Sequence, residues 1–228
     1  MPKEPQQDVI KSNAIAIATQ IIDTAPSEHM LIHMMEQLIL FGETITARLE
    51  STEPDAHIAC SRGCSYCCHM QVKVTPPEMF LILAHLTAEF NPAQMDILTE
   101  KIANNRRLTE GKDLEERVDM RHHTPCIFLH NHRCTIYPAR PLICRAWHSL
   151  DNSACESAYL LEDANAEIDT LPYRNYVYSM IREAVEAVCA EHEWHYGVFE
   201  LPLAMSLCLN RPLAMAHWLK SEPLIDIT

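Results

Sequence analysis

Four cysteines crowd into the short stretch ACSRGCSYCCHM, residues 59–70; they are Cys60, Cys64, Cys67 and Cys68. Thiolates suit zinc, cuprous copper and iron–sulfur clusters, and close thiols can also form disulfides or a redox pair. The spacing C-x3-C-x2-C lets three thiolates wrap around one centre. The adjacent pair is different, because neighbouring side chains in extended backbone point in opposite directions. We expect that pair to serve two metals, or to divide into one ligand and one core or redox thiol.

A second group of cysteines lies in residues 121–152, RHHTPCIFLHNHRCTIYPARPLICRAWHSLDN, and contains Cys126, Cys134 and Cys144. Cys155 follows at the start of the next predicted helix. Each group is short of partners alone, but together the eight thiols could close one shared site. Eight thiolates would also suffice for two four-coordinate centres.

The two cysteine loops have a charge opposite to that of the whole chain, which carries a formal net charge of −13. Residues 60–74 and 121–150 contain no Asp or Glu. Their basic residues are Arg62, Lys73, Arg121, Arg133, Arg140 and Arg145. Cations beside a thiolate-bound metal would offset its negative charge and favour the deprotonated thiols. The alternative is that these side chains pack against the fold or bind an anion such as phosphate.

Histidines in the same loops could complete a coordination sphere. They are His69, His122, His123, His130, His132 and His148. A single loop histidine is more often a polar surface residue, so we single out only His69 and His148, which lie near Cys68 and Cys144 in the chain. Cys189 and Cys208 occupy apolar helical segments, which is typical of core thiols.

The composition is that of a folded globular protein, with 228 residues, 48% of them hydrophobic. The N-terminus has polar and acidic residues where a signal peptide would be basic and then apolar. No run of 18 apolar residues occurs, so we expect a cytoplasmic protein without a membrane span. In a reducing compartment, cysteines are metal ligands or redox groups more often than disulfides. The acidic charge argues against nucleic acid as a partner.

Most of the chain shows helical periodicity, and we predict a mainly α, single helical domain over residues 1–228. The predicted helices are 7–24, 27–49, 76–90, 92–118 with a break at Gly111, 155–167, 172–194 and two short proline-led helices in 201–210 and 211–220. Segments 51–75 and 121–152 interrupt this pattern as irregular loops. Within the second, CIFL and CTIY flank HNHR, which predicts a short β-hairpin. We expect Pro138 and Pro141 to prevent a regular element after it.

Three pieces of the loops, CSRGCSYCC, PCIFL and CTIYPARPLICR, resemble the YkgJ-type cysteine-cluster family of zinc- or iron-chelating domains. The resemblance covers residues 60–155 and leaves the helices on either side as extensions. It implies metal-binding roles for Cys60, Cys64, Cys67, Cys68, Cys126, Cys134 and Cys144. Cys155 lies in a stretch that looks like an extension used by one branch of the family. The resemblance makes Arg140 and Arg145 supporting or packing residues.

The first functional hypothesis is a metal-binding protein, with a structural metal or with a cluster that transfers electrons to a protein partner or senses oxidants. We favour iron or an iron–sulfur cluster over zinc, because the thiols exceed one closed tetrahedral zinc site. A metal-dependent enzyme is an alternative, although no glycine-rich phosphate loop, G-x-S-x-G or HExxH motif assigns catalytic residues. A thiol–disulfide protein using CSYCC is another, but it leaves Cys126, Cys134 and Cys144 unexplained. The sequence does not determine the oligomeric state.

Overall fold

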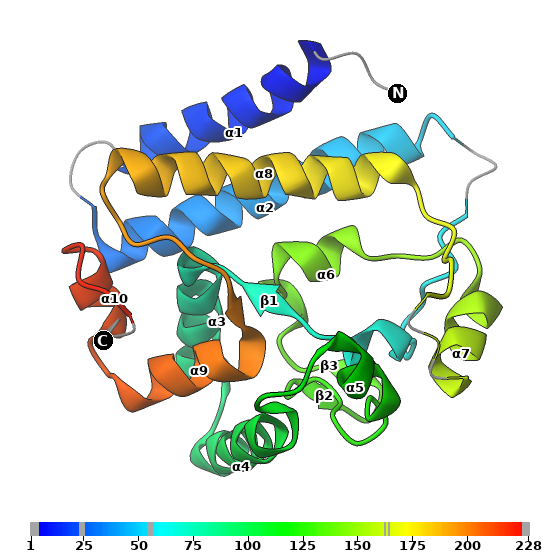
Figure 1. Ribbon diagram of the computed structural model, residues 1–228. Coiled ribbons are helices and arrows are strands. Elements are labelled where there is room, and N and C mark those ends of the chain that lie inside the picture. The colour runs from blue at the N-terminus through cyan, green and yellow to red at the C-terminus, as the bar shows by residue number, and fades with distance from the viewer. Residues whose placement is uncertain (1–4, 23–25, 54–56, 162, 164, 225–228) are drawn as a thin grey trace.

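The computed structural model describes residues 5–22, 26–53, 57–161, 163 and 165–224, and its ribbon is mainly helical (Figure 1). This confirms the predicted fold class. No helix in these ranges is both long and apolar enough to cross a membrane.

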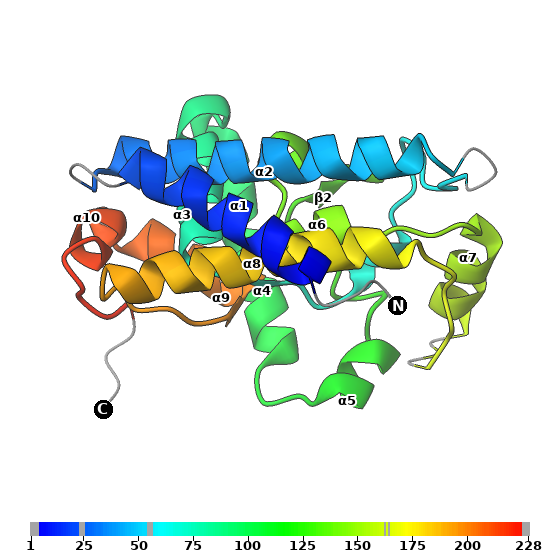
Figure 2. The ribbon, with the colours of Figure 1, turned by 90° about the horizontal axis from the view of Figure 1, so that it is seen from above.

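Three long helices form one layer: α1 (Pro5–Ile22), α2 (Glu28–Glu50) and α8 (Pro172–Glu191) (Figure 2). Ser27, the first residue of predicted helix 27–49, caps α2, with its hydroxyl accepting from the Met30 N–H at 3.3 Å. Gly42 lets α2 approach α8 closely, because a Cβ there would stand 2.7 Å from Ile181 Cδ1. Predicted helix 7–24 is observed as α1; residues 23 and 24 lie outside the described residues.

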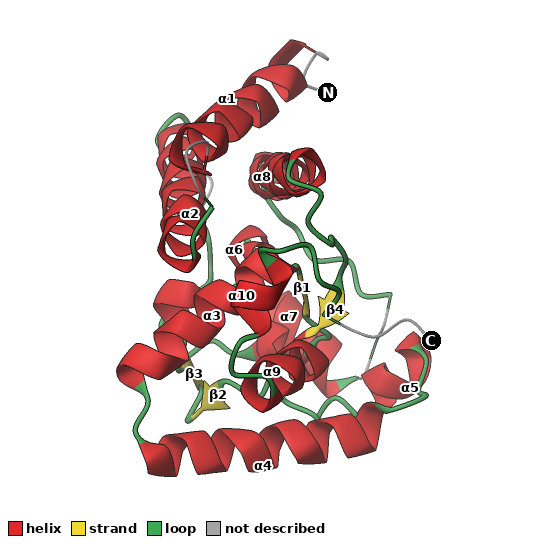
Figure 3. Ribbon diagram, turned by 90° about the vertical axis from the view of Figure 1, so that its left-hand side faces the viewer, coloured by secondary structure: helices red, strands yellow, loops and turns green. Residues whose placement is uncertain are grey.

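Four further helices lie below this layer: α3 (Pro76–Glu89), α4 (Pro92–Thr109), α9 (Leu201–Asn210) and α10 (Ala214–Trp218) (Figure 3). Helix α3 packs against α2 and α9, and α4 packs against α9. Predicted helix 92–118 breaks where expected: Gly111 has φ 73°, and the short α5 (Leu114–Asp119) follows it. Cys189 and Cys208 are buried in the hydrophobic core, as predicted.

Two short antiparallel pairs accompany the helices. β2 (Leu129–His130) and β3 (Arg133–Cys134) form the predicted hairpin around HNHR. Asn131 and His132 both have positive φ, 48° and 57°, as the two central residues of a type I′ turn require. β1 (Lys73–Val74) pairs with β4 (Phe199–Glu200), which the sequence did not predict because the two strands are far apart in the chain.

The segment after the hairpin corrects two predictions. It contains the 3-10 turn η2 (Tyr137–Ala139) and the short helix α6 (Leu142–Ala146), so the expectation that the prolines prevent regular structure was wrong. Pro141 immediately precedes α6, where its missing N–H leaves no helical hydrogen bond unmade. Predicted helix 155–167 was also wrong in its bounds. α7 runs from Asn152 to Leu160, because Asp151 caps it early by accepting from the Ser153 N–H.

Candidate metal centre

The first cysteine loop runs between α7 and the β2–β3 hairpin (Figure 1). It contains the 3-10 turn η1 (Tyr66–His69), which carries the adjacent cysteines Cys67 and Cys68. Two backbone hydrogen bonds fix the loop at both sides. The Ala59 N–H donates to the Ser149 carbonyl at 2.8 Å, and the Cys126 N–H donates to the Cys68 carbonyl at 2.7 Å. The two loops, distant in sequence, therefore meet as the spacing of their cysteines suggested.

Three cysteines of the second loop form what we call the inner group: Cys126, Cys134 and Cys144. All three are partly buried and pack against the hydrophobic core. Burial raises the pKa of the Cys126 thiol to about 12. The pKa of Cys144 is also raised, first by burial and then by repulsion from the Cys126, Cys67 and Cys134 thiolates.

Cations border the inner group. Arg140 opposes the rise in pKa that burial causes at Cys134, and Lys101 of α4 does the same at Cys126. Arg145 is almost fully buried; it donates to the Arg140 carbonyl at 3.0 Å and pairs with Glu43. Sequence reasoning found the two arginines but missed Lys101, which comes from a helix outside the loops.

Arg121, another cation of the cysteine loops, makes packing contacts between α5 and α7. It is buried, and its guanidinium donates to the carbonyls of Val118 at 3.0 Å and Ala158 at 3.2 Å. These bonds tie the end of α5 to α7, so this side chain matches the packing alternative.

Three further cysteines form the outer group: Cys60, Cys64 and Cys155. The Cys64 thiol donates to the Asn152 side-chain carbonyl at 3.3 Å, and Cys155 lies one helical turn further along α7. The pKa of Cys64 is raised, mainly by burial and also by the Cys60, Cys67 and Cys155 thiolates. Helix α7 thus brings Cys155 to the first loop, although the sequence associated it only loosely with the site.

The adjacent pair Cys67–Cys68 lies between the two groups. The pKa of Cys67 is raised, first by a hydrogen bond with the Cys68 thiol, while the residue itself is exposed at the surface. The Cys67 thiolate in turn raises the pKa of Cys144 in the inner group and of Cys64 in the outer group. The pair occupies a 3-10 turn and not the extended backbone from which its two roles were argued, and those roles stay a prediction.

The donor set fits a thiophilic metal in its chemistry but is not drawn together into a closed ligand shell. All eight loop cysteines are free thiols. Within the described ranges, no three histidine, cysteine, aspartate or glutamate side chains lie close enough to hold an ion without movement. A metal would therefore have to draw the thiols of a group inward.

The two foremost histidines have other hydrogen-bonding roles. His148 is buried, with Nδ1 donating to the Ala146 carbonyl at 2.7 Å and Nε2 accepting from the Leu171 N–H at 2.6 Å. Both its ring nitrogens are used, so it joins the end of α6 to the start of α8 and is not placed as a ligand. His69 donates from Nδ1 to the Arg121 carbonyl at 3.1 Å and packs against the Tyr159 ring.

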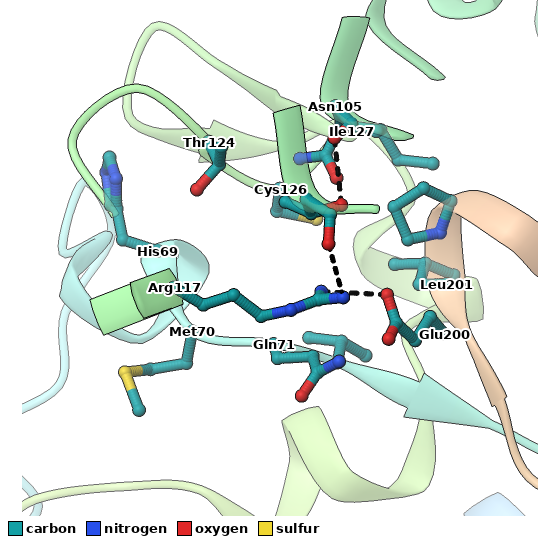
Figure 4. Close-up of a pocket in the computed structure, with 13 residues that line it drawn as sticks. His69, Met70, Gln71, Asn105, Arg117, Thr124, Cys126, Ile127, Glu200 and Leu201 are labelled. Atoms are coloured by element: carbon teal, nitrogen blue, oxygen red, sulfur yellow. Dashed lines mark hydrogen bonds and ion pairs between the residues drawn. The ribbon is translucent and has the colours of Figure 1, made fainter. Parts of the chain in front are cut away.

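A small cavity of about 50 Å³ opens beside Cys126 and is also lined by His69 (Figure 4). Arg117 of α5 crosses it to pair with Glu200 at 2.8 Å and donates to the Thr109 carbonyl at 2.8 Å. Sequence reasoning missed this cavity because Arg117 and Glu200 are far apart in the chain.

Comparison with known proteins agrees with the donor set. The family model CxxCxxCC, described as "Putative zinc- or iron-chelating domain", matches residues 59–165. This range contains both thiol groups and the adjacent pair, and the match confirms the resemblance to a zinc- or iron-chelating domain family. No curated protein and no solved structure matches the chain.

Proposed function

We propose that this protein, whose residues 59–165 belong to the CxxCxxCC family of zinc- or iron-chelating domains, binds zinc or iron through the thiolates of its two loops. The observation that carries the proposal is the meeting of the two loops, where the Cys126 N–H donates to the Cys68 carbonyl and the Cys64 thiol donates to Asn152. The proposed ligands are Cys60, Cys64, Cys67, Cys68, Cys126, Cys134, Cys144 and Cys155.

The protonation of the thiols supports a metal over a redox role. Burial raises the pKa of Cys64, Cys126, Cys134, Cys144 and Cys155, and hydrogen bonding raises that of Cys67. Reactive disulfide-exchange thiols have a lowered pKa, because the thiolate is the nucleophile. A divalent cation reverses the effect by replacing the thiol protons. The raised pKa values of Cys64 and Cys67 argue against a C-x2-C redox pair.

Among the possible metals we favour iron, bound as single ions or as an iron–sulfur cluster. Eight thiols are more than one closed zinc site uses. Arg140 and Lys101 beside the inner group would offset the negative charge that four thiolates leave on a divalent centre. With an iron–sulfur cluster, the role of the protein would be electron transfer to a protein partner or the sensing of oxidants.

The test is metal and sulfide analysis, with an absorption spectrum, of the full chain purified without oxygen. We expect bound iron, and for a cluster also acid-labile sulfide with a broad band near the boundary of the visible and ultraviolet. Colourless protein with stoichiometric zinc would keep metal binding and reject iron. Folded protein with neither metal would reject the proposed function.

Matched cysteine variants assign the ligands. Cys144→Ser removes an inner thiol and is expected to lower the bound metal clearly. Cys208→Ala removes a buried thiol of α9 that belongs to neither group, and it should leave the metal content unchanged. Equal loss of metal in both variants would point to a general effect of cysteine removal on folding and count against Cys144 as a ligand.

A further inference from the structure

The thiols of the two loops divide by position into two sets. Helix α7 and the β2–β3 hairpin lie on opposite sides of the first loop (Figure 1). Cys64 is bonded to Asn152 on α7, while Cys126 is bonded through its N–H to the Cys68 carbonyl. The first loop therefore meets α7 at Cys64 and through the η1 turn, and the Cys68 carbonyl joins that turn to the segment before the hairpin.

Each set holds three thiols, one fewer than a closed tetrahedral centre uses. The outer set is Cys60, Cys64 and Cys155, and the inner set is Cys126, Cys134 and Cys144. The adjacent pair supplies two more thiols, and both belong to the η1 turn. Two adjacent cysteines would be strained as ligands of the same tetrahedral ion. They can instead give one thiolate to the inner set and one to the outer set.

We infer that the two loops hold two metal ions in separate centres, one at the inner group and one at the outer group, each completed by a thiolate of the Cys67–Cys68 pair. This inference rests on the proposed function and adds the number and division of the ions. Each divalent zinc or ferrous ion forms four metal–sulfur bonds and releases four thiol protons to solvent.

The two centres differ in how firmly their ligands are held. The inner thiols are packed against the core, whereas Cys60 is exposed. The outer ligands come from an irregular loop and from the first turns of α7, which has no fully buried residue. Solvent and competing ligands therefore reach the outer ion first, and we expect it to exchange faster than the inner ion.

Cobalt(II) is a suitable probe, because it takes tetrahedral thiolate sites and its absorption reports the number of thiolate ligands. Reduced, full-length, metal-free protein is titrated with cobalt without oxygen. The wild-type chain should bind about two equivalents, and Cys155→Ser or Cys144→Ser should each bind about one. The double variant should bind none with tetrahedral thiolate character.

Release kinetics then separate the centres. With a chelator in excess, Cys144→Ser, which keeps the outer ion, should lose cobalt at least about tenfold faster than Cys155→Ser, which keeps the inner ion. Ser157→Ala, an exposed position on α7, and Cys208→Ala serve as controls and should bind cobalt as the wild type does. Circular dichroism of every variant shows whether the fold is retained.

Other results overturn the inference in distinguishable ways. One equivalent that is lost in both single variants means one centre shared by the two groups. One equivalent lost only in Cys144→Ser means that the outer thiols bind no metal. Each of these rejects two centres and keeps the proposed function, whereas no binding of cobalt, zinc or iron by folded protein rejects the proposed function itself.

Discussion

The inner and outer thiol groups contain the same number of cysteines but are supported by different parts of the molecule. The inner group borders the core, and its helix α6 contacts α8 of the upper layer. The outer group depends on α7, a surface helix whose described contacts are mainly with η1. Cysteine thiols are thus held against the core in the inner group and on a surface helix and loop in the outer group.

One carboxylate binds the start of α6 and another binds the start of α7. They differ in burial, as the two thiol groups do. Glu78 is 4% exposed and accepts from the Leu142 N–H at the start of α6 (2.8 Å) and from the Thr75 N–H (2.8 Å) and hydroxyl (2.7 Å). Asp151 is exposed and accepts from the Ser153 N–H and hydroxyl at the start of α7. The inner anchor joins two helices across the core, whereas the outer anchor is a local cap.

The largest effect is expected from removing the buried cation of the inner region. Arg145→Ala leaves a cavity and frees the Arg140 and Pro138 carbonyls, to which Arg145 donates at 3.0 and 2.5 Å. It also breaks the pair with Glu43. Chemical denaturation should show a loss of about 3 kcal/mol in the free energy of unfolding, because buried hydrogen-bond acceptors are left without their donor.

Arg62→Ala is the matched change in the outer loop. Arg62 is exposed between Cys60 and Cys64, so its removal should leave the unfolding midpoint unchanged. Equal destabilisation by the two variants would remove the proposed difference in support.

The two anchoring carboxylates give the next comparison. Glu78→Ala strands three donors in the core and should lower the free energy of unfolding by about 2 kcal/mol. Asp151→Ala should have a clearly smaller effect, because water can replace an exposed cap. Thermal and denaturant unfolding of both variants measures this difference, and a larger loss for Asp151→Ala would reverse the ranking of the two supports.

Local chemistry made much of the helical frame predictable. Ser27 before α2, the proline at the start of α3 and Gly111 after α4 act on their own neighbours, and each element begins or ends where these residues indicate. The hairpin was predictable for the same reason, since Asn131 and His132 occupy the turn between the two apolar stretches.

The division of the thiols was not predictable from spacing. Cys155 is closer in sequence to Cys144 than to Cys64, yet α7 places it with Cys64. Lys101 acts on Cys126 because α4 returns beneath the hairpin, where it donates to the Leu129 carbonyl at 2.8 Å. Such contacts depend on how helices pack, which one-dimensional periodicity does not encode.

Alkylation of the metal-free, reduced chain compares the two groups directly. Cys60 is exposed, whereas Cys126 packs against the core and burial raises its pKa to about 12. Iodoacetamide reacts with the thiolate, so at pH 8 Cys60 should be modified at least about tenfold faster than Cys126. Peptide mass spectrometry over a time course measures both rates, and similar rates would show that the inner group is open to solvent.

The smallest effect concerns His148, at the junction between α6 and α7, next to Ser149, whose carbonyl holds the Ala59 N–H of the outer loop. Burial lowers the pKa of His148 below the usual 6.5, and the neutral ring accepts from the Leu171 N–H. Below pH 6.5 the unfolded chain takes up a proton that the folded chain resists, so stability present above that pH is lost as the pH falls.

Between pH 7.5 and 5.5 this histidine should therefore remove up to about 1 kcal/mol from the free energy of unfolding. His148→Gln can keep a donor toward Ala146 and an acceptor toward Leu171 but does not titrate, so its stability should depend less steeply on pH. Other histidines, His69 included, are unchanged in both proteins, and the difference between the two pH profiles isolates His148. If the stability of the two proteins changes with pH in parallel, protonation of His148 does not destabilise the junction between α6 and α7.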